Sequence, residues 1–436
     1  MRSSSNGAKC ATGSADLMVL GGETATRFHG WRMVGVAFVV EFFAVGFFFY
    51  SFGVYLKAIE AELTGSRLGV SLGMMVTSAV GAILAPFVGR ALDRYPIKRI
   101  MLMGAVALSF GFALLSRVDA IWQFYLVLGS FVAFGTSMMG GLASAKLVAN
   151  WFQARRGTAL GIAGVGISFS GVVMPPVAAW LVSEYGWRGG YLVYALATLV
   201  VVVPTVGLFV VNRPEDMELR PDGAAPQPEQ SHADSIEVAW STRQILHSRN
   251  YWAIALPFAL SFSTLSAILV HLVPHASDSG IPIARAAWVL SFAAGAGVLG
   301  KLVFGRLVDF VDPRFAVWTS FGTQLAGLLV IMQQPGYAGL VAGAVIFGFG
   351  MGGVVPLQGA VAGLAFGRLS FGTVLGLIRP LQFSFNLIGI PLAGWIHDTT
   401  GSYDAAWKFF CGVYIVASLM VAALRVQRAP SAPAAA

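Results

Sequence analysis

Twelve apolar runs, each close to 20 residues long, constrain this chain more than any other feature of its sequence. An α-helix rises about 1.5 Å per residue, so about 20 apolar residues cross the roughly 30 Å hydrocarbon core of a bilayer. The runs lack the alternation of barrel strands. We therefore predict an all-α membrane protein with 12 transmembrane helices, near residues 33–55, 69–91, 100–116, 121–145, 157–182, 189–211, 252–273, 287–308, 315–333, 338–362, 372–396 and 406–424.

The composition supports insertion into a lipid bilayer and excludes other classes of protein. Lys and Arg number 28 and Asp and Glu 20 among 436 residues, so 11% are charged, where soluble chains carry about 25%. The hydrophobic fraction of 57% excludes a disordered chain. The net charge of +8 is scattered between the apolar runs, so we expect no nucleic-acid partner.

The basic residues predict the orientation of the chain. If the N-terminus is cytosolic, 19 Lys and Arg residues lie in cytosolic segments and six on the opposite side. Cytosolic loops carry the excess of Lys and Arg in membrane proteins. We therefore expect both termini to be cytosolic.

The apolar runs fall into two sets of six, separated by a polar segment. Residues 212–250 contain 11 of the 48 charged residues and no apolar run. The sequence predicts a flexible cytosolic linker over 212–250 between a bundle over 31–211 and a second bundle over 251–425. Residues 1–30 and 426–436 are predicted cytosolic tails.

Two short motifs recur at nearly one offset. Residues 89–93, Gly-Arg-Ala-Leu-Asp, match residues 305–309, Gly-Arg-Leu-Val-Asp, at an offset of 216. Residues 157–161, Gly-Thr-Ala-Leu-Gly, match residues 372–376, Gly-Thr-Val-Leu-Gly, at an offset of 215. Because both copies have the same orientation, they predict two six-helix bundles related by a pseudo-two-fold axis along the membrane normal, as in rocking transporters.

The first motif resembles the major facilitator superfamily, whose loop after the second span contains G-x-x-x-D-R. In this chain Asp93 and Arg94 keep the acid and the base, while Pro96 replaces a glycine. An Asp at a cytosolic helix end can pair with an Arg from a neighbouring helix, in a pair that breaks when the cytosolic side opens. We predict such a charge clamp from Asp93, Arg94, Arg90 and Asp309.

A narrower resemblance surrounds the fifth span. Residues 151–164, Trp-Phe-Gln-Ala-Arg-Arg-Gly-Thr-Ala-Leu-Gly-Ile-Ala-Gly, are similar to the signature of monocarboxylate porters. Residues 213–216 and 219–223 resemble the linker of bacterial porters of this group, and residues 51–54 resemble its first span. The resemblance extends to the oxalate/formate antiporter-like group and, with the Ala- and Gly-rich composition, implies a bacterial cytoplasmic (inner) membrane.

Three ionisable residues lie inside the apolar runs at a similar predicted depth. Glu41, Lys301 and Arg379 are each about 10–12 Å from the cytosolic boundary at the helical rise. A charged group at mid-membrane costs roughly 2.5–3.5 kcal/mol on insertion scales, so each needs a functional or structural reason. Two bases and one acid at one level suit an anion.

The resemblance gives these bases a role. Oxalate/formate-type antiporters hold carboxylates with one base in span 8 and one in span 11, the positions of Lys301 and Arg379. Gln382 and Asn386 share a helical face with Arg379 and are predicted hydrogen-bond partners of the substrate. Tyr50 stands where eukaryotic monocarboxylate porters carry a lysine, and it is included in the predicted site. Pairing of either base with Glu41 or with helix carbonyls remains the alternative.

Other polar residues receive weaker assignments. Glu41 is a candidate proton-coupling group, because burial and nearby cations act on carboxyl pKa values in opposite directions. Lys146 is expected to extend toward the lipid headgroups. His271 and His275 are four residues apart but lack a third ligand, so no metal and no cofactor are predicted.

The combined prediction is a monomeric secondary transporter, embedded in the lipid bilayer, that moves a small carboxylate by alternating access. Coupling to protons and exchange of anions are both left open. One alternative is a transporter of another cargo, such as a drug, a sugar or an organic cation. A membrane-embedded enzyme is a further alternative.

Overall fold

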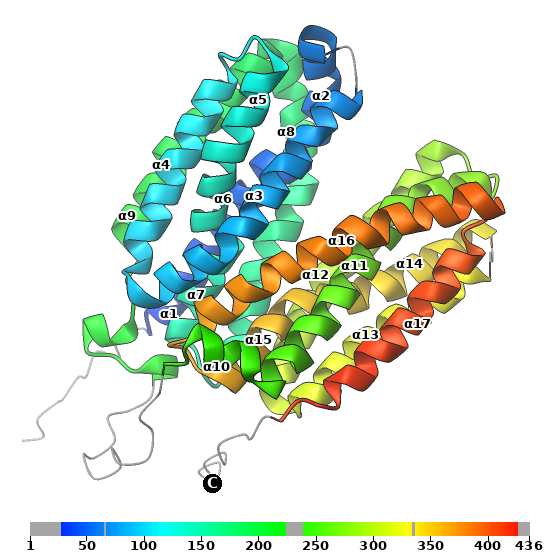
Figure 1. Cartoon of the computed structure of the whole chain (residues 1–436). Coiled ribbons are helices and arrows are strands. Elements are labelled where there is room, and N and C mark those ends of the chain that lie inside the picture. Colours follow the sequence, from blue (N-terminus) through cyan, green and yellow to red (C-terminus); the bar gives the residue numbers. More distant parts are fainter. Residues whose placement is uncertain (1–27, 65–66, 224–238, 334–335, 426–436) are drawn as a thin grey trace, which may run out of the picture.

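The computed structural model describes residues 28–64, 67–223, 239–333 and 336–425. Within these ranges helices form two groups, which lie close together at one end of the molecule and diverge toward the other (Figure 1). The linker residues lie at the end where the groups meet, which we call the linker end. Most of the predicted N-terminal tail, the middle of the predicted linker and the predicted C-terminal tail lie outside the described residues.

The first group of helices precedes the linker. It contains α1 (Gly30–Val45), α2 (Ser51–Ile59), α3 (Arg67–Arg94), α4 (Ile97–Leu115), α5 (Ile121–Val127), α6 (Ala133–Met139), α7 (Gly141–Trp151), α8 (Arg156–Ala197) and α9 (Val203–Phe209). Short π-helical turns continue several of these helices, at Gly46–Tyr50, Glu60–Thr64, Leu128–Val132 and Thr198–Val202.

The second group follows the linker, which contributes the short α10 (Thr242–His247). The second group contains α11 (Arg249–Asp278), α12 (Ile283–Phe310), α13 (Pro313–Met332), α14 (Gly336–Gly352), α15 (Val354–Phe366), α16 (Phe371–Thr400) and α17 (Asp404–Val421).

Eleven helical segments of the described chain are long and apolar enough to cross a membrane. One of them, Arg156–Phe209, carries two of the predicted apolar runs. The two runs are separated at Gly186, whose φ of 67° is left-handed and interrupts the helical geometry of α8. The 11 segments therefore account for the 12 predicted spans, and the predicted all-helical class is confirmed.

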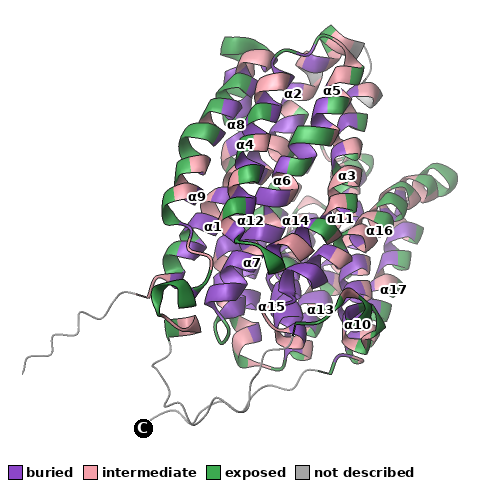
Figure 2. Cartoon of the chain, turned by 60° about the vertical axis from the view of Figure 1, so that its left-hand side comes forward, coloured by how far each residue is buried: buried purple, intermediate pink, exposed green. Residues whose placement is uncertain are grey.

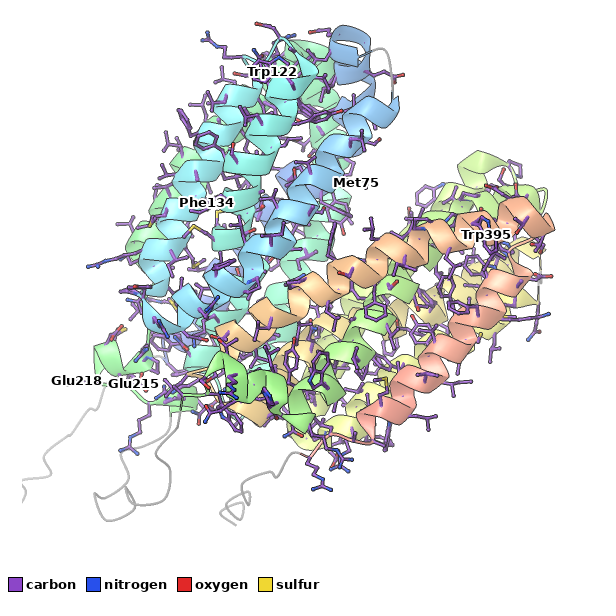
Figure 3. The ribbon with its side chains drawn as sticks, in the orientation of Figure 1. Met75, Trp122, Phe134, Glu215, Glu218 and Trp395 are labelled. Carbon is purple, nitrogen blue, oxygen red and sulfur yellow. The ribbon has the colours of Figure 1, made fainter. Side chains whose placement is uncertain are left out.

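Large apolar side chains cover much of the outer surface, as expected where lipid is the solvent. Trp122, Phe134 and Trp395 are 62%, 37% and 64% exposed and project from the two groups of helices (Figure 3). Buried residues gather where α7, α12 and α15 meet near the linker end (Figure 2). The buried core of the molecule therefore includes the junction between the two bundles.

Glycines bring the two bundles into backbone contact at this junction. A Cβ atom at Gly89 of α3 would overlap the carbonyl oxygen of Gly372 of α16. A Cβ at Gly305 of α12 would lie 2.6 Å from the carbonyl oxygen of Gly157 of α8. The two contacts involve the repeated motifs, so each bundle packs through the same motifs against the other. Small residues allow this close approach of helices in membranes.

The spans formed by α6–α7 and by α14–α15 are interrupted at comparable positions of the two halves. Gly140 has a non-helical ψ of −145° between α6 and α7. α14 ends at Gly352 and α15 begins at Val354. Irregular backbone at membrane depth is tolerated where it is enclosed by protein or lines a cavity. These interruptions mark the middle of both bundles as a candidate location for a site.

The packing of α12 against α14 within the second bundle can be tested with one glycine. A Cβ at Gly300 would overlap the carbonyl oxygen of Phe349, so Gly300→Ala should lower the free energy of unfolding by about 1–3 kcal/mol. Gly295→Ala, on the same helix, meets nothing within 4 Å and is the matched control. Thermal unfolding of the purified protein in detergent measures both. Equal melting temperatures would contradict this account of the packing.

Candidate site between the two bundles

The carboxylate of Asp93 binds the start of a helix from the opposite bundle. It accepts hydrogen bonds from the backbone N–H groups of Gly372 and Thr373, at 3.0 and 2.7 Å, and from the Thr373 hydroxyl at 2.7 Å. The first N–H groups of a helix have no partner within the helix and carry partial positive charge. Asp93 therefore joins α3 of the first bundle to α16 of the second.

Asp309 makes the same contact in the opposite direction. It accepts hydrogen bonds from the N–H groups of Gly157 and Thr158, both at 2.8 Å, and from the Thr158 hydroxyl at 2.6 Å. Each bundle thus supplies one carboxylate and one helix start. The two motifs that the sequence repeats meet crosswise at the linker end.

The predicted cation of the charge clamp is corrected by the structure. Lys146 of α7 pairs with Asp93 at 2.6 Å, with both side chains buried, and also donates to the carbonyl of Arg368. Arg90 instead lies over the Phe87 ring and donates to its own helix, and Arg94 is exposed. The cation paired with Asp93 is thus Lys146 and not an Arg of a neighbouring helix, and the prediction that Lys146 extends toward headgroups is wrong. A nearby acid from α3 is a better partner for a buried ammonium than a distant membrane surface.

Glu41 and Arg379 approach each other across the bundle interface. Both lie beside Gly141 at the start of α7, where a Cβ would be 3.6 Å from Glu41 Oε1 and 3.2 Å from an Arg379 terminal nitrogen. The two charges interact electrostatically, and Ser144 of α7 lies beside Glu41. Glu41 is buried at 4% exposure, whereas Arg379 is exposed and has no hydrogen bond or ion pair to another described residue. The guanidinium is therefore available to an incoming anion.

Lys301 crosses the interface at a different helix pair. Its ammonium donates a 2.6 Å hydrogen bond to the Ser168 hydroxyl of α8, and its methylene groups lie over Gly164. Lys301 is buried, and Ser168 is its only hydrogen-bonding partner among the described residues. Tyr50 packs its ring on Gly171, about one turn further along α8. Lys301 and Tyr50 therefore both contact α8, whereas Arg379 and Glu41 both lie beside the start of α7.

The internal repeat places the two cations at equivalent depths. Lys301 corresponds to Ala85 at the offset of 216, and Arg379 corresponds to Gly164 at the offset of 215. Gly164 packs against Lys301, and the carbonyl of Ala85 packs against Gly376, one turn before Arg379. Lys301 therefore lies in the contact of α12 with α8, and Arg379 lies on α16, which makes the pseudo-symmetric contact with α3. Both come from the second bundle and point at the first.

The two predicted amide residues lie on α16 beyond Arg379, with a third amide beside them. Gln382 donates a long hydrogen bond of 3.4 Å to Gln358 of α15, and both are buried. Gln358 Nε2, Gln382 Oε1 and Asn386 Oδ1 lack partners among the described residues. Sequence inspection missed Gln358 and Ser168. Gln358 could have been noticed as an isolated Gln in the predicted run 338–362, whereas no sequence signal marked Ser168.

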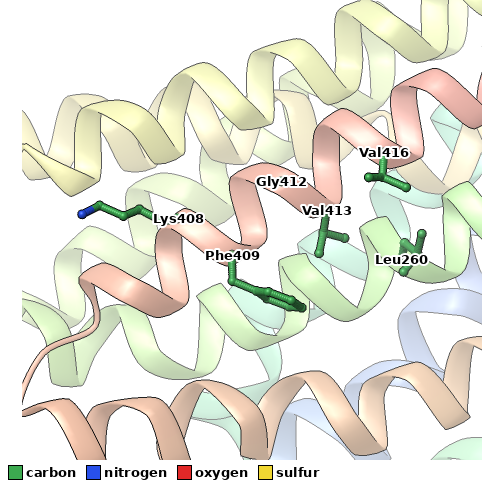
Figure 4. Close-up of a pocket in the computed structure, with 6 residues that line it drawn as sticks. All are labelled: Leu260, Lys408, Phe409, Gly412, Val413 and Val416. Carbon is green, nitrogen blue, oxygen red and sulfur yellow. The ribbon is translucent and has the colours of Figure 1, made fainter.

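The histidines and an apolar surface groove of the second bundle do not belong to this site. His271 interacts with the Tyr403 hydroxyl and the Ile390 carbonyl at 3.2 and 3.1 Å. The described residues contain no group of three or more His, Cys, Asp or Glu residues that could hold a metal. A groove of about 360 Å³ between α11 and α17 is lined by apolar side chains, with Lys408 at one end (Figure 4). Lys408 is its one charged lining residue, and no amide side chain lines it.

The sequence matches the Major Facilitator Superfamily over residues 38–384 and again over residues 273–436. Because the first match covers most of the chain, the protein belongs to this superfamily. Monocarboxylate transporter 13 of Bos taurus is 27% identical over 393 residues, covering 89% of this chain and 87% of the relative. Monocarboxylate transporter 11 of Homo sapiens is 28% identical over 388 residues, covering 87% and 79%.

Solved structures of the superfamily share the fold. The human organic anion transporter MFSD10 (TETRAN) superposes with a TM-score of 0.71 at 15% identity, covering 90% of this chain and 99% of that one. FucP in its outward conformation gives 0.68 at 15% identity, covering 92% and 100%. The relatives are transporters, which sets aside the alternative of a membrane-embedded enzyme.

The corrected ion pair gives a direct test of the clamp. Lys146→Met leaves the buried Asp93 carboxylate without its cation, and loss of one partner of a buried pair costs about 3–5 kcal/mol. Arg90→Met removes a cation that is not paired with Asp93 and should change stability by less than about 1 kcal/mol. Thermal unfolding of both variants measures the difference. An equal loss in both would show that Arg90 shares the clamp.

Proposed function

We propose that this protein is a secondary transporter of a small monocarboxylate that works by alternating access. One observation carries the proposal: two cations from the second bundle face the first bundle, and one acid lies beside one of them. With Glu41 ionised, its charge offsets that of Arg379, and Lys301 leaves the site with a net charge of about +1. A monoanion bound together with one proton leaves this net charge unchanged, whereas a dianion bound with one proton lowers it to zero.

The chemistry of the two cations suits a carboxylate. The Arg379 guanidinium can bind both carboxylate oxygens in a bidentate fork, and Lys301 acts as a point charge. The neutral amides of Gln382 and Asn386 and the ring of Tyr50 complete the proposed site. The names of the relatives, monocarboxylate transporters and an organic anion transporter, support a small organic anion as cargo.

Proton coupling through Glu41 is part of the proposal. A proton on Glu41 removes the negative charge beside Arg379, so the guanidinium attracts the carboxylate more strongly. Anion and proton then favour each other's binding by the same factor. The site loaded with one proton and one monoanion has the same net charge as the empty site with ionised Glu41. Because the two forms carry the same charge, a complete transport cycle moves no net charge, which corresponds to electroneutral symport.

The orientation and state of the protein complete the proposal. We place the linker end in the cytosol, because the excess of Lys and Arg lies there, and we place the protein as a monomer in a bacterial cytoplasmic membrane. The bundles contact at the linker end and diverge at the other, which corresponds to an outward-facing state. The similarity in fold to FucP in its outward conformation supports this assignment.

The anion site predicts a pattern of ligand stabilisation. A carboxylate at 100 times its Kd should stabilise the protein by about 2.7 kcal/mol in thermal unfolding. Lys301→Met and Arg379→Met should each lose most of this effect, and Lys408→Met, which removes an exposed lysine of α17, should keep it. Stabilisation by sugars or amines in place of carboxylates would overturn the cargo class.

The proton site predicts the behaviour of one isosteric variant. Glu41→Gln mimics the protonated acid, so uptake in proteoliposomes should lose its dependence on pH and on a proton gradient while exchange of labelled for unlabelled carboxylate continues. Glu184→Gln, an exposed acid outside the site, is the control. A pH profile that is unchanged in Glu41→Gln would remove Glu41 from the coupling step.

A further inference from the structure

The beginning of the linker is folded, although the sequence predicted a flexible tether. Residues 212–223 contain two short 3-10 turns, Pro214–Met217 and Pro221–Gly223. Asp216 accepts a hydrogen bond from the N–H of Arg213 at 3.2 Å, and Gly223 has a left-handed φ of 71°. We call residues 212–223 the strap. Its position near the junction of the bundles suggests more than a covalent connection.

The strap is anchored to the first bundle at both of its ends. The side-chain oxygen of Asn212 accepts a hydrogen bond from the N–H of Lys98, and its backbone carbonyl accepts one from the Asn150 side chain, both at 2.9 Å. At the other end, the Asp222 carboxylate accepts the N–H groups of three successive residues at 2.8, 2.8 and 3.2 Å, namely Gln153, Ala154 and Arg155. Charge-assisted hydrogen bonds of this kind are stronger than neutral ones.

The middle of the strap reaches the second bundle. Glu215 forms an ion pair with Arg368, which lies in the loop between α15 and α16. Two further hydrogen bonds reach the same loop. Lys146 of α7 donates to the Arg368 carbonyl, and the N–H of Trp240 donates to the Ser370 hydroxyl at 2.7 Å. The strap therefore spans the two bundles at a loop adjacent to the helix start that Asp93 binds.

Two carboxylates, one from the strap and one from the second bundle, accept backbone N–H groups at and just before the start of α8. Asp222 of the strap binds the N–H groups of residues 153–155, and Asp309 of the second bundle binds those of Gly157 and Thr158. The strap thus stands beside both clamp contacts, with Asp222 next to the Asp309 contact and Glu215 next to the Asp93 contact. Opening of the linker end must separate Asp309 from the start of α8 and Arg368 from Glu215.

We propose that the strap is a working part of the gate at the linker end, which holds that end closed through the Glu215–Arg368 ion pair. Asp222 keeps the strap on the first bundle, so that Glu215 can hold the second. Separation of the bundles breaks the ion pair, and the strap therefore favours the state in which the linker end is closed. The proposal requires alternating access and does not depend on the cargo.

The size of the expected effect follows from exposure. Both side chains of the pair are partly exposed, at 22% for Arg368 and 44% for Glu215, and exposed ion pairs shift equilibria by roughly two- to fivefold. Glu215→Gln should therefore raise the ratio of open to closed linker ends by about two- to fivefold. Asp222→Asn should raise it as well, because the strap then loses its anchor. The double variant should add little to the larger single effect.

The experiment measures the opening of the linker end directly. Spin labels at Tyr95 and Phe315, exposed residues of the first and second bundles at that end, report the distance between the bundles by pulsed electron resonance in the full-length protein. Cys10 and Cys411 are replaced by Ser beforehand. The share of long distances is compared between variants, without any substrate. Thermal unfolding verifies that each variant is folded.

Glu218→Gln is the matched control. Glu218 lies on the same strap, close to Glu215 (Figure 3), and forms no ion pair with another described residue. Glu218→Gln removes the same charge but keeps the Glu215–Arg368 ion pair, so it should leave the distances between the spin labels unchanged. The exchange of both charges in Glu215→Arg with Arg368→Glu should restore the closed population that either single change reduces.

Two results would overturn the proposal. One is an unchanged distance distribution in both Glu215→Gln and Asp222→Asn, which would return the strap to a passive connection. The other is an equal shift in Glu218→Gln, which would assign the effect to net charge at the linker end. Neither result bears on Lys301, Arg379 or the cargo, so failure of the strap and failure of the proposed function are distinguishable.

Discussion

The structure depends on the binding of a carboxylate from each bundle to the start of a helix in the other. Asp93 and Asp309 each accept two backbone N–H groups and one threonine hydroxyl. These N–H groups would otherwise lack partners, and the helix dipole adds to their attraction for an anion. Because the contacts are reciprocal, they fix the register of both interfaces and bring Gly89 into backbone contact with Gly372, and Gly305 with Gly157.

The two bundles are related by pseudo-symmetry, but the cations Lys301 and Arg379 do not follow it. The repeat pairs Lys301 with Ala85 and Arg379 with Gly164, so one member of each pair is a cation and the other is small. Gly164, the counterpart of Arg379 in the repeat, lies against the methylene groups of Lys301. Both cations belong to the second bundle, whereas Glu41 and the Ser168 hydroxyl belong to the first.

Much of the fold was predictable because its signals are local. The length and hydropathy of an apolar run decide whether it spans a bilayer, and the repeated motifs revealed the two-fold relation of the bundles. The site was predictable in part, since an ionisable residue within an apolar run is conspicuous by itself. Ser168 and Gln358 were not, because serine and glutamine are common enough in spans that only their neighbours give them meaning.

The sequence by itself determined the helical class, the repeat and which ionisable residues lie within apolar runs, since each follows from residues near one another in the chain. Only the tertiary structure decided how the charges pair. Lys146 meets Asp93 and Glu41 lies near Arg379 across separations of 53 and hundreds of residues, respectively. Such pairings depend on which helices become neighbours and on the depth of each side chain, and neither quantity is encoded in local sequence.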